Sequence, residues 1–160
     1  MAGFTHFNDE GRAKMVDVSA KPVTDRVAKA AATVYLNRET FDMVVEGRAK
    51  KGDVLAVAQV AGIMAAKKTG DIIPMCHPIA LHGVDINFEL DSGKSTIRII
   101  AAARCRGETG VEMEAMTAAS VAALTVYDMC KAVQRDIIIG DVMLLYKSGG
   151  KSGEFKREDF

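Results

Sequence analysis

The chain has 160 residues, of which 49% are hydrophobic and 26% are charged, a composition that fits one soluble globular domain with enough apolar material for a core. Its 21 basic and 21 acidic side chains cancel, which argues against nucleic-acid binding through bulk charge. The three cysteines are widely spaced and form no CxxC motif, so a reducing, cytoplasmic setting fits better than a disulfide framework.

No segment of the sequence is typical of export or of membrane insertion. The N-terminal residues are polar and lack an apolar signal core. The longest charge-free runs, Val54–Ala66 and Ala115–Tyr127, are shorter than the about 20 residues that span a bilayer. We expect a single domain over residues 1–160, with a polar N-terminal arm over about 1–15 and a flexible C-terminal tail over about 148–160.

The first half of the chain predicts a strand followed by helices. Alternating small and apolar residues predict a strand over residues 26–36. Residues 37–47 are ambiguous and fit a short helix that Gly47 ends. Asp53 is a suitable N-cap for a helix that runs to about Lys68. The buried face of the strand is expected to hold Ala28, Ala30, Ala32, Val34 and Leu36.

The second half predicts a hairpin, a long helix and a last strand. Residues 83–90 and 95–106 both alternate, and the DSGK segment between them is a good turn. A helix fits residues 112–133 and a buried strand fits 137–147. The order β-α-β-β-α-β predicts an α+β, ferredoxin-like fold, with two helices on one face of a four-stranded antiparallel sheet.

Both main helices are apolar on nearly every side and rich in alanine. A helix of this kind has to be covered all round. One small sheet cannot cover two such helices, so we expect part of their surface to contact another subunit.

The long helix carries only four charges, namely Glu112, Glu114, Asp128 and Lys131. Asp128 and Lys131 are three residues apart and are therefore neighbours on the helix surface. They fit an ordinary helix ion pair, with the glutamates favouring the helix N-terminus. They also fit a general acid/base pair set in an apolar wall, where burial and pairing tune proton transfer.

Residues 74–78 read PMCHP, a Cys-His pair with a proline at each end. The pair could belong to a zinc site, but His6 and His82 are the only other histidines and no second Cys/His cluster exists. A nucleophile–base pair requires side chains that face each other, which adjacent residues rarely do. A buried structural turn and a rigid substrate clamp around His77 remain open.

Several lysines could line an anion pocket, although each fits a solvated surface when taken alone. They are Lys50, Lys51, Lys67, Lys68, Lys147 and Lys151. The glycines of SGGKSG expose backbone N–H groups that suit phosphate. The segment is not a Walker A loop, because Leu145 stands where the first glycine would be.

Three long segments resemble the cyclic pyranopterin monophosphate synthase family of molybdenum cofactor biosynthesis. They are KKTGDIIPMCHPIAL, GVEMEAMTAASVAALTVYDMCKAV and LLYKSGGKSG, and the resemblance covers about residues 15–153. Within these segments the chain departs from the usual family residues at Gly70, Met75 and Met116. None of these departures removes a charged group. The resemblance implies a lyase that converts a cyclised dihydro-GTP intermediate into cyclic pyranopterin monophosphate and pyrophosphate.

The resemblance also implies roles for single residues. Asp128 and Lys131 are the expected catalytic acid/base pair. The expected substrate-binding residues are Met75, Cys76, His77, Met113, Glu114, Glu112, Lys51, Lys67 and Lys147. Lys67 and Glu112 are weaker matches, as is Lys151. The family is a homohexamer, a trimer of dimers with sites at the dimer interfaces. We expect no tightly bound cofactor and no metal ligands, with Mg²⁺ able to accompany the substrate triphosphate.

Two other function classes are alternatives to this enzyme. A non-catalytic nucleotide-binding scaffold would keep a basic pocket and would not need Asp128 paired with Lys131. An RNA-binding domain of this fold stacks bases on sheet aromatics. The exposed strand positions here are instead Asp85, Asn87, Glu89 and Arg98, which disfavours RNA.

Overall fold

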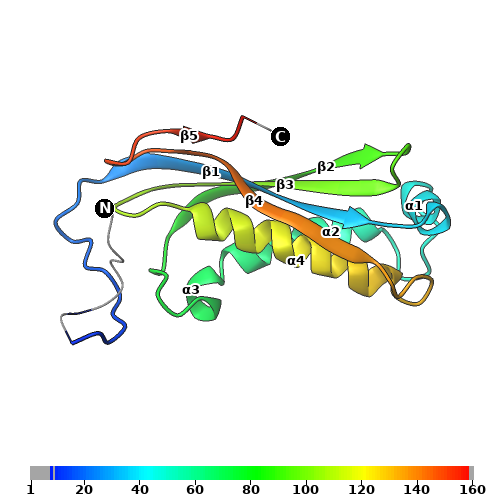
Figure 1. Cartoon of the computed structure of the whole chain (residues 1–160), viewed down its shortest axis with the longest axis horizontal. Helices are drawn as coiled ribbons and strands as arrows, with labels where there is room; N and C mark the ends of the chain where they lie inside the picture. The colour runs from blue at the N-terminus through cyan, green and yellow to red at the C-terminus, as the bar shows by residue number, and fades with distance from the viewer. Residues whose placement is uncertain (1–7, 9, 159–160) are drawn as a thin grey trace.

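The computed structural model describes residue 8 and residues 10–158, which form an α+β fold with one antiparallel sheet. The sheet makes one layer and the helices cover one of its faces (Figure 1). The predicted fold class, α+β with an antiparallel sheet, is therefore confirmed.

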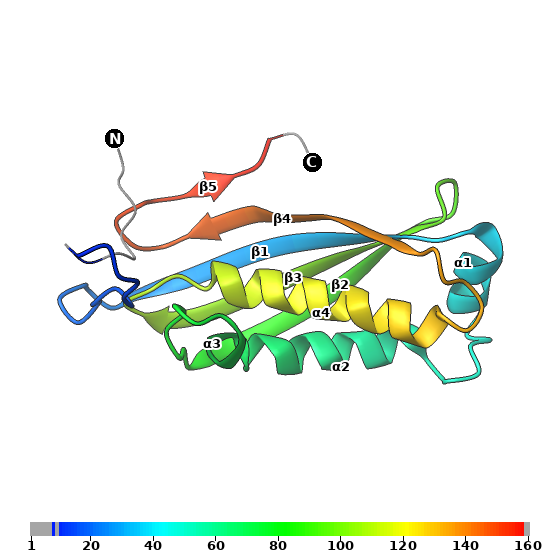
Figure 2. The ribbon, with the colours of Figure 1, turned by 60° about the horizontal axis from the view of Figure 1, so that its bottom comes forward.

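The sheet has five strands, not the four predicted. They are β1 (Thr24–Tyr35), β2 (Leu81–Asp91), β3 (Thr96–Gly107), β4 (Ile138–Ser148) and β5 (Phe155–Lys156). Their order across the sheet is β2-β3-β1-β4-β5, with every neighbouring pair antiparallel. The fifth strand arises because the C-terminal segment turns back and pairs with β4 through Tyr146 and Lys147 (Figure 2). The segment expected as a flexible tail thus contains a short strand.

The helices are α1 (Arg38–Val45), α2 (Val54–Ala66), α3 (Thr69–Ile72) and α4 (Glu112–Cys130). Asn37 caps α1 by accepting a hydrogen bond from the Thr40 amide, and Asp53 caps α2 by accepting one from the Ala56 amide. The predicted cap at Asp53 is confirmed, as is the short helix before Gly47, whose φ is +66°. The predicted helix over 112–133 ends at Cys130, and a turn follows it.

Small residues fill the space between the sheet and the helices. The alanines at positions 28, 30 and 32 of β1 are fully buried. So are five alanines of α4, which are Ala115, Ala118, Ala119, Ala122 and Ala123. Helix α2 lies beside α4 (Figure 2). They meet at Gly62, where an added Cβ would lie 2.8 Å from the Ala118 carbonyl oxygen. Because alanine and glycine keep side chains short, α4 sits close to both the sheet and α2.

The outward face of the helix pair is apolar and uncovered. Val57, Val60 and Met64 on α2 are 43%, 58% and 61% exposed, and Leu124 on α4 is 58% exposed. Exposed apolar residues gathered on one face are candidates for an interaction surface. Within the described residues, no helix is long and apolar enough to cross a membrane.

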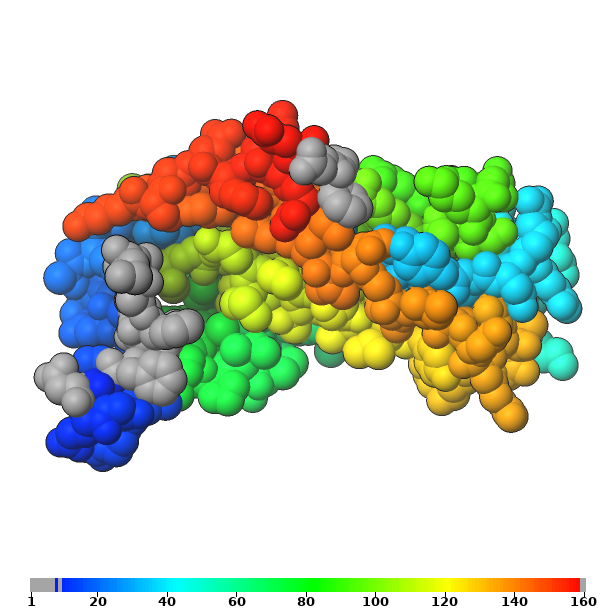
Figure 3. All heavy atoms as spheres, in the orientation of Figure 1, coloured from blue at the N-terminus to red at the C-terminus, as the bar shows by residue number. Residues whose placement is uncertain are grey.

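The N-terminal end of α4 is where distant parts of the chain meet. The segment before β1 (blue) projects below the sheet beside α3 (green) (Figure 3). The loop between α3 and β2 contains PMCHP and lies at the same end of the molecule (Figure 2). These segments form the walls of a cavity.

Candidate active site

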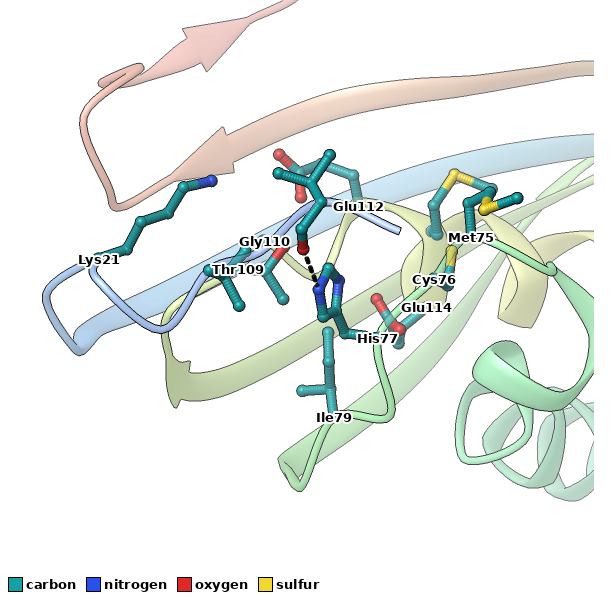
Figure 4. Close-up of a pocket in the computed structure, with 12 residues that line it drawn as sticks. Lys21, Met75, Cys76, His77, Ile79, Thr109, Gly110, Glu112 and Glu114 are labelled. Atoms are coloured by element: carbon teal, nitrogen blue, oxygen red, sulfur yellow. Dashed lines mark hydrogen bonds between the residues drawn. The ribbon is translucent and has the colours of Figure 1, made fainter. Parts of the chain in front are cut away.

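A cavity of 430 Å³ lies at the N-terminal end of α4. Three segments far apart in the sequence line it: the N-terminal segment, the PMCHP loop, and the loop that leads from β3 into α4 (Figure 4). Its lining includes six of the predicted substrate-binding residues, Met75, Cys76, His77, Glu112, Met113 and Glu114. A volume of this size is within the range of small-molecule sites.

PMCHP is a tight turn that also holds the N-terminal segment. The Cys76 amide donates to the Ile73 carbonyl at 3.0 Å, which closes the turn. The Nε2 atom of His77 lies 2.7 Å from the Val16 carbonyl oxygen and donates to it (dashed line in Figure 4). His77 therefore ties the PMCHP loop to the segment that forms the opposite wall of the cavity.

The Cys76 thiol is poorly suited to act as a nucleophile. Burial, helped by the nearby Glu114 carboxylate, raises the pKa of this thiol. A raised pKa reduces the thiolate fraction, which is the reactive form. The nucleophile–base interpretation of the Cys-His pair is thus disfavoured.

Glu114 is the most deeply buried acid of the cavity, with 3% of its surface exposed. Burial raises the pKa of its carboxyl group, and the nearby Glu112 carboxylate adds to this shift. Its carboxyl points toward Cys76 and His77 (Figure 4). A carboxyl with a raised pKa inside a cavity can release and accept protons nearer to neutral pH than an exposed one.

A second charged cluster lies at the other end of α4. The Nζ atom of Lys131 is 2.7 Å from Oδ1 of Asp128, and the Nζ atom of Lys51 is 3.1 Å from its Oδ2. Lys51 also donates to the Asp128 backbone carbonyl at 2.8 Å. The two ammonium groups hold the pKa of the Asp128 carboxyl below its usual value, with Lys131 the larger cause. Asp128 in turn raises the pKa of Lys131.

Two of the remaining predicted lysines lie near the N-terminal end of α4. Lys67 shares a small cavity with Glu114. Lys147 donates to the Ser152 hydroxyl in the loop that follows β4. The predicted residues thus fall into two groups. Nine of them, including Lys151, lie at or beside the N-terminal end of α4. The other three, Asp128, Lys131 and Lys51, lie near its C-terminal end.

The chain is similar to known proteins along nearly its whole length. The sequence profile of the MoaC family matches residues 15–150. The chain is 59% identical over 97% of its length to a cyclic pyranopterin monophosphate synthase of Peptoclostridium acidaminophilum, covering 98% of that protein. The chain belongs to the MoaC family.

Similar relatives occur in other bacteria. A cyclic pyranopterin monophosphate synthase of Thermoanaerobacter pseudethanolicus is 60% identical over 96% of this chain and 98% of its own length. One of Bacillus mycoides is 55% identical over 98% of this chain and 99% of its own length. The similarity to the MoaC relatives therefore extends through both charged clusters and the loops that hold them.

In the single chain, Asp128 and Lys131 form an exposed helix ion pair, the first of the two alternatives that the sequence left open. Their side chains are 56% and 52% exposed, so they do not lie in an apolar wall. The helix turns them outward because its buried face is occupied by alanines. The buried acid of α4 is Glu114, which the sequence analysis assigned only to substrate contact.

Sequence reasoning missed several residues of the cavity walls, among them Val16, Lys21 and Arg26. Val16 and Lys21 line the main cavity, and Arg26 lines an adjoining one. A signal for Arg26 was present, because it continues the alternation of Ala28 and Ala30 on the buried face of β1. No comparable signal marks Val16 and Lys21, since their segment has no periodic pattern.

No group of three or more potential His, Cys, Asp or Glu metal ligands occurs among the residues that the structure describes. The zinc interpretation of PMCHP requires at least three such ligands. Within that part of the chain, PMCHP acts as a turn and as an anchor for Val16.

Proposed function

We propose that this chain converts a cyclised dihydro-GTP intermediate into cyclic pyranopterin monophosphate and pyrophosphate, as a lyase of molybdenum cofactor biosynthesis. The observation that carries the proposal is identity of 55–60% with enzymes of that name over nearly the full length of both chains. A cavity that gathers six predicted substrate-binding residues supports it.

The chemistry requires proton transfers and the release of an anion. The purine-derived ring opens and recloses as a pterin, which moves protons on nitrogen and oxygen atoms. The cyclic phosphate forms when a substrate hydroxyl attacks the α-phosphorus: a new P–O bond forms, the bond to the β-phosphate breaks, and pyrophosphate leaves. A base takes the hydroxyl proton, and cationic groups stabilise the leaving charge.

We assign the residues of the chain to these tasks by their environment. Glu114, buried and with a raised pKa, is suited to donate and accept protons inside the cavity. Asp128 and Lys131 form the second proton-transfer group, with Lys51 as its other partner. The PMCHP turn, through Met75 and His77, makes a rigid wall against the substrate.

The two groups cannot act together within one chain. Glu114 and Asp128 are 14 residues apart on a continuous helix, a separation of about 21 Å at 1.5 Å per residue. An antiparallel pairing of two copies would bring the Asp128 end of one helix next to the Glu114 end of the other. The exposed apolar residues Val60, Met64 and Leu124 supply surface on the helix pair that such a pairing would cover.

We therefore propose that the active unit is a dimer with two shared sites, assembled into the homohexamer that the family resemblance implies. A ferredoxin-like core extended by one edge strand is the architecture we propose for each subunit, since the order β2-β3-β1-β4 supports it. A cytoplasmic location, the absence of a resident cofactor, and Mg²⁺ entering with the substrate triphosphate remain predictions.

The direct test is incubation of the purified protein with the cyclised dihydro-GTP intermediate. We expect a pterin product and pyrophosphate in equal amounts, and neither product when GTP replaces the intermediate. A nucleotide-binding scaffold would bind the intermediate and release nothing. Stoichiometric binding without any product would reject the proposed activity.

A further inference from the structure

The turn that follows α4 is tied to the start of α1 by one buried side chain. Gln134 lies in that turn, shortly after Lys131, and only 8% of its surface is exposed. Its Oε1 atom accepts a hydrogen bond of 2.9 Å from the Asn37 amide. Asn37 is the N-cap of α1, and its own side chain accepts a hydrogen bond of 2.8 Å from the Thr40 amide. Gln134 therefore binds the residue at which α1 begins.

The turn itself is bonded to the end of α4. The amides of Val133 and Gln134 both donate to the Cys130 carbonyl, at 2.9 and 3.1 Å. The Tyr127 hydroxyl donates to the Arg135 carbonyl at 3.1 Å. Because these bonds fix the turn on both sides of Gln134, its side chain is an acceptor whose place is set by α4.

Helix α1 in turn leads to Lys51, which follows it in the loop before α2. With eight residues, α1 is too short to be stable alone, so its position depends on contacts with the rest of the fold. Phe41 packs it into the core, and Arg38 donates from its exposed side to the Ser92 carbonyl. Gln134 adds the link to α4, at the end of the molecule where α1 and the turn after α4 lie side by side (Figure 2).

These contacts close a ring around Asp128. Lys131 reaches its Oδ1 from the end of α4, and Lys51 reaches its Oδ2 across 77 positions of the chain. The three side chains are 45–56% exposed. Exposed ion pairs are too weak to hold long side chains in one geometry by themselves. The arrangement therefore depends on how the two lysine-bearing segments are fixed to each other.

We propose that Gln134 is a positioning residue for the group formed by Lys51, Asp128 and Lys131. By holding the start of α1 against the turn after α4, it keeps one ammonium on each oxygen of the Asp128 carboxylate, which fixes the orientation of that carboxylate. A misplacement of about 1 Å in a catalytic group can cost about a hundredfold in rate. The inference rests on the proposed function, in which these side chains transfer protons.

The test compares three substitutions of Gln134. Gln134→Leu removes the acceptor at similar size, and Gln134→Asn keeps the amide but shortens its reach by one methylene. Gln134→Glu keeps an acceptor oxygen, and its negative charge is favourable beside the N-terminus of α1. Gln59→Leu is the matched control, because Gln59 is the other glutamine of the chain and lies partly buried on α2.

Two readouts are taken on the same preparations. Steady-state kinetics with the cyclised intermediate should show kcat about ten- to a hundredfold lower in Gln134→Leu and Gln134→Asn, with a smaller change in KM. Competitive acetylation, read by mass spectrometry, should show Lys51 reacting severalfold faster relative to Lys68, because its ammonium is no longer shielded by Asp128. Gln134→Glu and Gln59→Leu should behave as the wild type in both.

A double-variant cycle separates positioning from a general structural effect. If Gln134 acts through Lys51, Gln134→Leu should change kcat little in a chain that already carries Lys51→Met. Equal losses of kcat with and without Lys51→Met, or unchanged acetylation of Lys51, would overturn the inference. If Gln134→Leu does not fold, Gln134→Asn is judged by the same two criteria.

The acetylation readout also separates this inference from the proposed function, because it needs no substrate. A wild-type protein without turnover would refute the proposed function. Faster acetylation of Lys51 in Gln134→Asn would then still support the link from Gln134 to Lys51, and an unchanged rate would reject it.

Discussion

Glu114 and Asp128 lie on the same helix in opposite electrostatic environments. Glu114 is 3% exposed, and burial raises the pKa of its carboxyl. The Asp128 side chain is 56% exposed and lies between two lysine ammonium groups that lower its pKa. The Glu114 environment thus favours the protonated carboxyl, and the Asp128 environment favours the ionised one. Two carboxyls with pKa values shifted in opposite directions are suited to acid and base roles.

Replacing Glu114 with glutamine should lower turnover and raise stability. Loss of a proton-transfer group costs about a hundred- to ten-thousandfold in rate. Because the folded-state pKa of this carboxyl is raised above its ordinary value of 4.5, ionisation destabilises the fold as pH rises from 4.5 through the folded-state pKa. A neutral glutamine avoids that loss. Thermal unfolding should show a higher Tm for Glu114→Gln at about pH 7 and a similar Tm at about pH 4. A lower Tm at neutral pH would contradict this account.

Asp128→Ala and Lys131→Ala should each lower turnover by about a hundred- to ten-thousandfold, while melting temperatures change little because the pair is exposed. The double variant should be little worse than the worse single variant, since the two groups act as a unit. Turnover and Tm are measured on the same preparations, with Lys68→Ala as control because Lys68 forms a similar exposed ion pair with Asp71. Near-normal turnover of folded Lys131→Ala would remove Lys131 from the mechanism.

His77→Ala should release the N-terminal segment from the cavity wall. The hydrogen bond from His77 to the Val16 carbonyl is a link between that segment and the PMCHP loop. We expect faster trypsin cleavage after Lys14, and a KM that rises more than kcat falls. His82→Ala is the control, because His82 is exposed on β2 and does not line the cavity. Equal proteolysis rates in both variants would show that His77 does not hold the segment.

Mixing two inactive variants should restore activity if the sites are shared between subunits. In a dimer of one Glu114→Gln chain and one Lys131→Ala chain, one site carries both substitutions and the other carries neither. Random exchange should therefore recover about a quarter of wild-type activity. Sedimentation of the same mixture should show an oligomer. A stable monomer, or no recovery of activity after subunit exchange, would show that Glu114 and Lys131 do not form a site shared between subunits.

Alanine at Gly149 should destabilise the fold more than alanine at Gly153. Both glycines have positive φ, so both substitutions strain the backbone. Only at Gly149 would the added Cβ also strike neighbouring atoms, those of Asp25 and Arg26, whereas Gly153 has open space. Urea unfolding should give a free energy of unfolding roughly 1–3 kcal/mol lower for Gly149→Ala than for Gly153→Ala. Equal values would mean that the loop does not press on Arg26.

The sequence predicted the main elements well because their signals are local. Asp53 and Asn37 cap helices through contacts within three residues, and alternation marked β2 and β3. Strand β5 escaped prediction because two residues, Phe155 and Lys156, carry no periodicity and pair only once β4 is in place.

The site was predicted in its residues more than in its arrangement. The family resemblance supplied Met75, His77 and Glu114, and the fold brings them to one cavity. Sequence spacing could not show that Asp128 faces solvent in the single chain, because that depends on which side of α4 packs on the sheet. Nor could it show that Val16 is a wall, since His77 reaches it across 61 positions of the chain.

The alanine-lined contact between α4 and β1 has a mechanical consequence. Helix and sheet meet through side chains that have no rotamers to change, so the contact cannot yield by repacking. A push on one end of α4 would therefore move the whole helix as a rod and displace Glu114 and Asp128 together. The spacing between the two acids is in this sense a fixed length built into the protein. In the proposed dimer, that length would set the distance between the two shared sites.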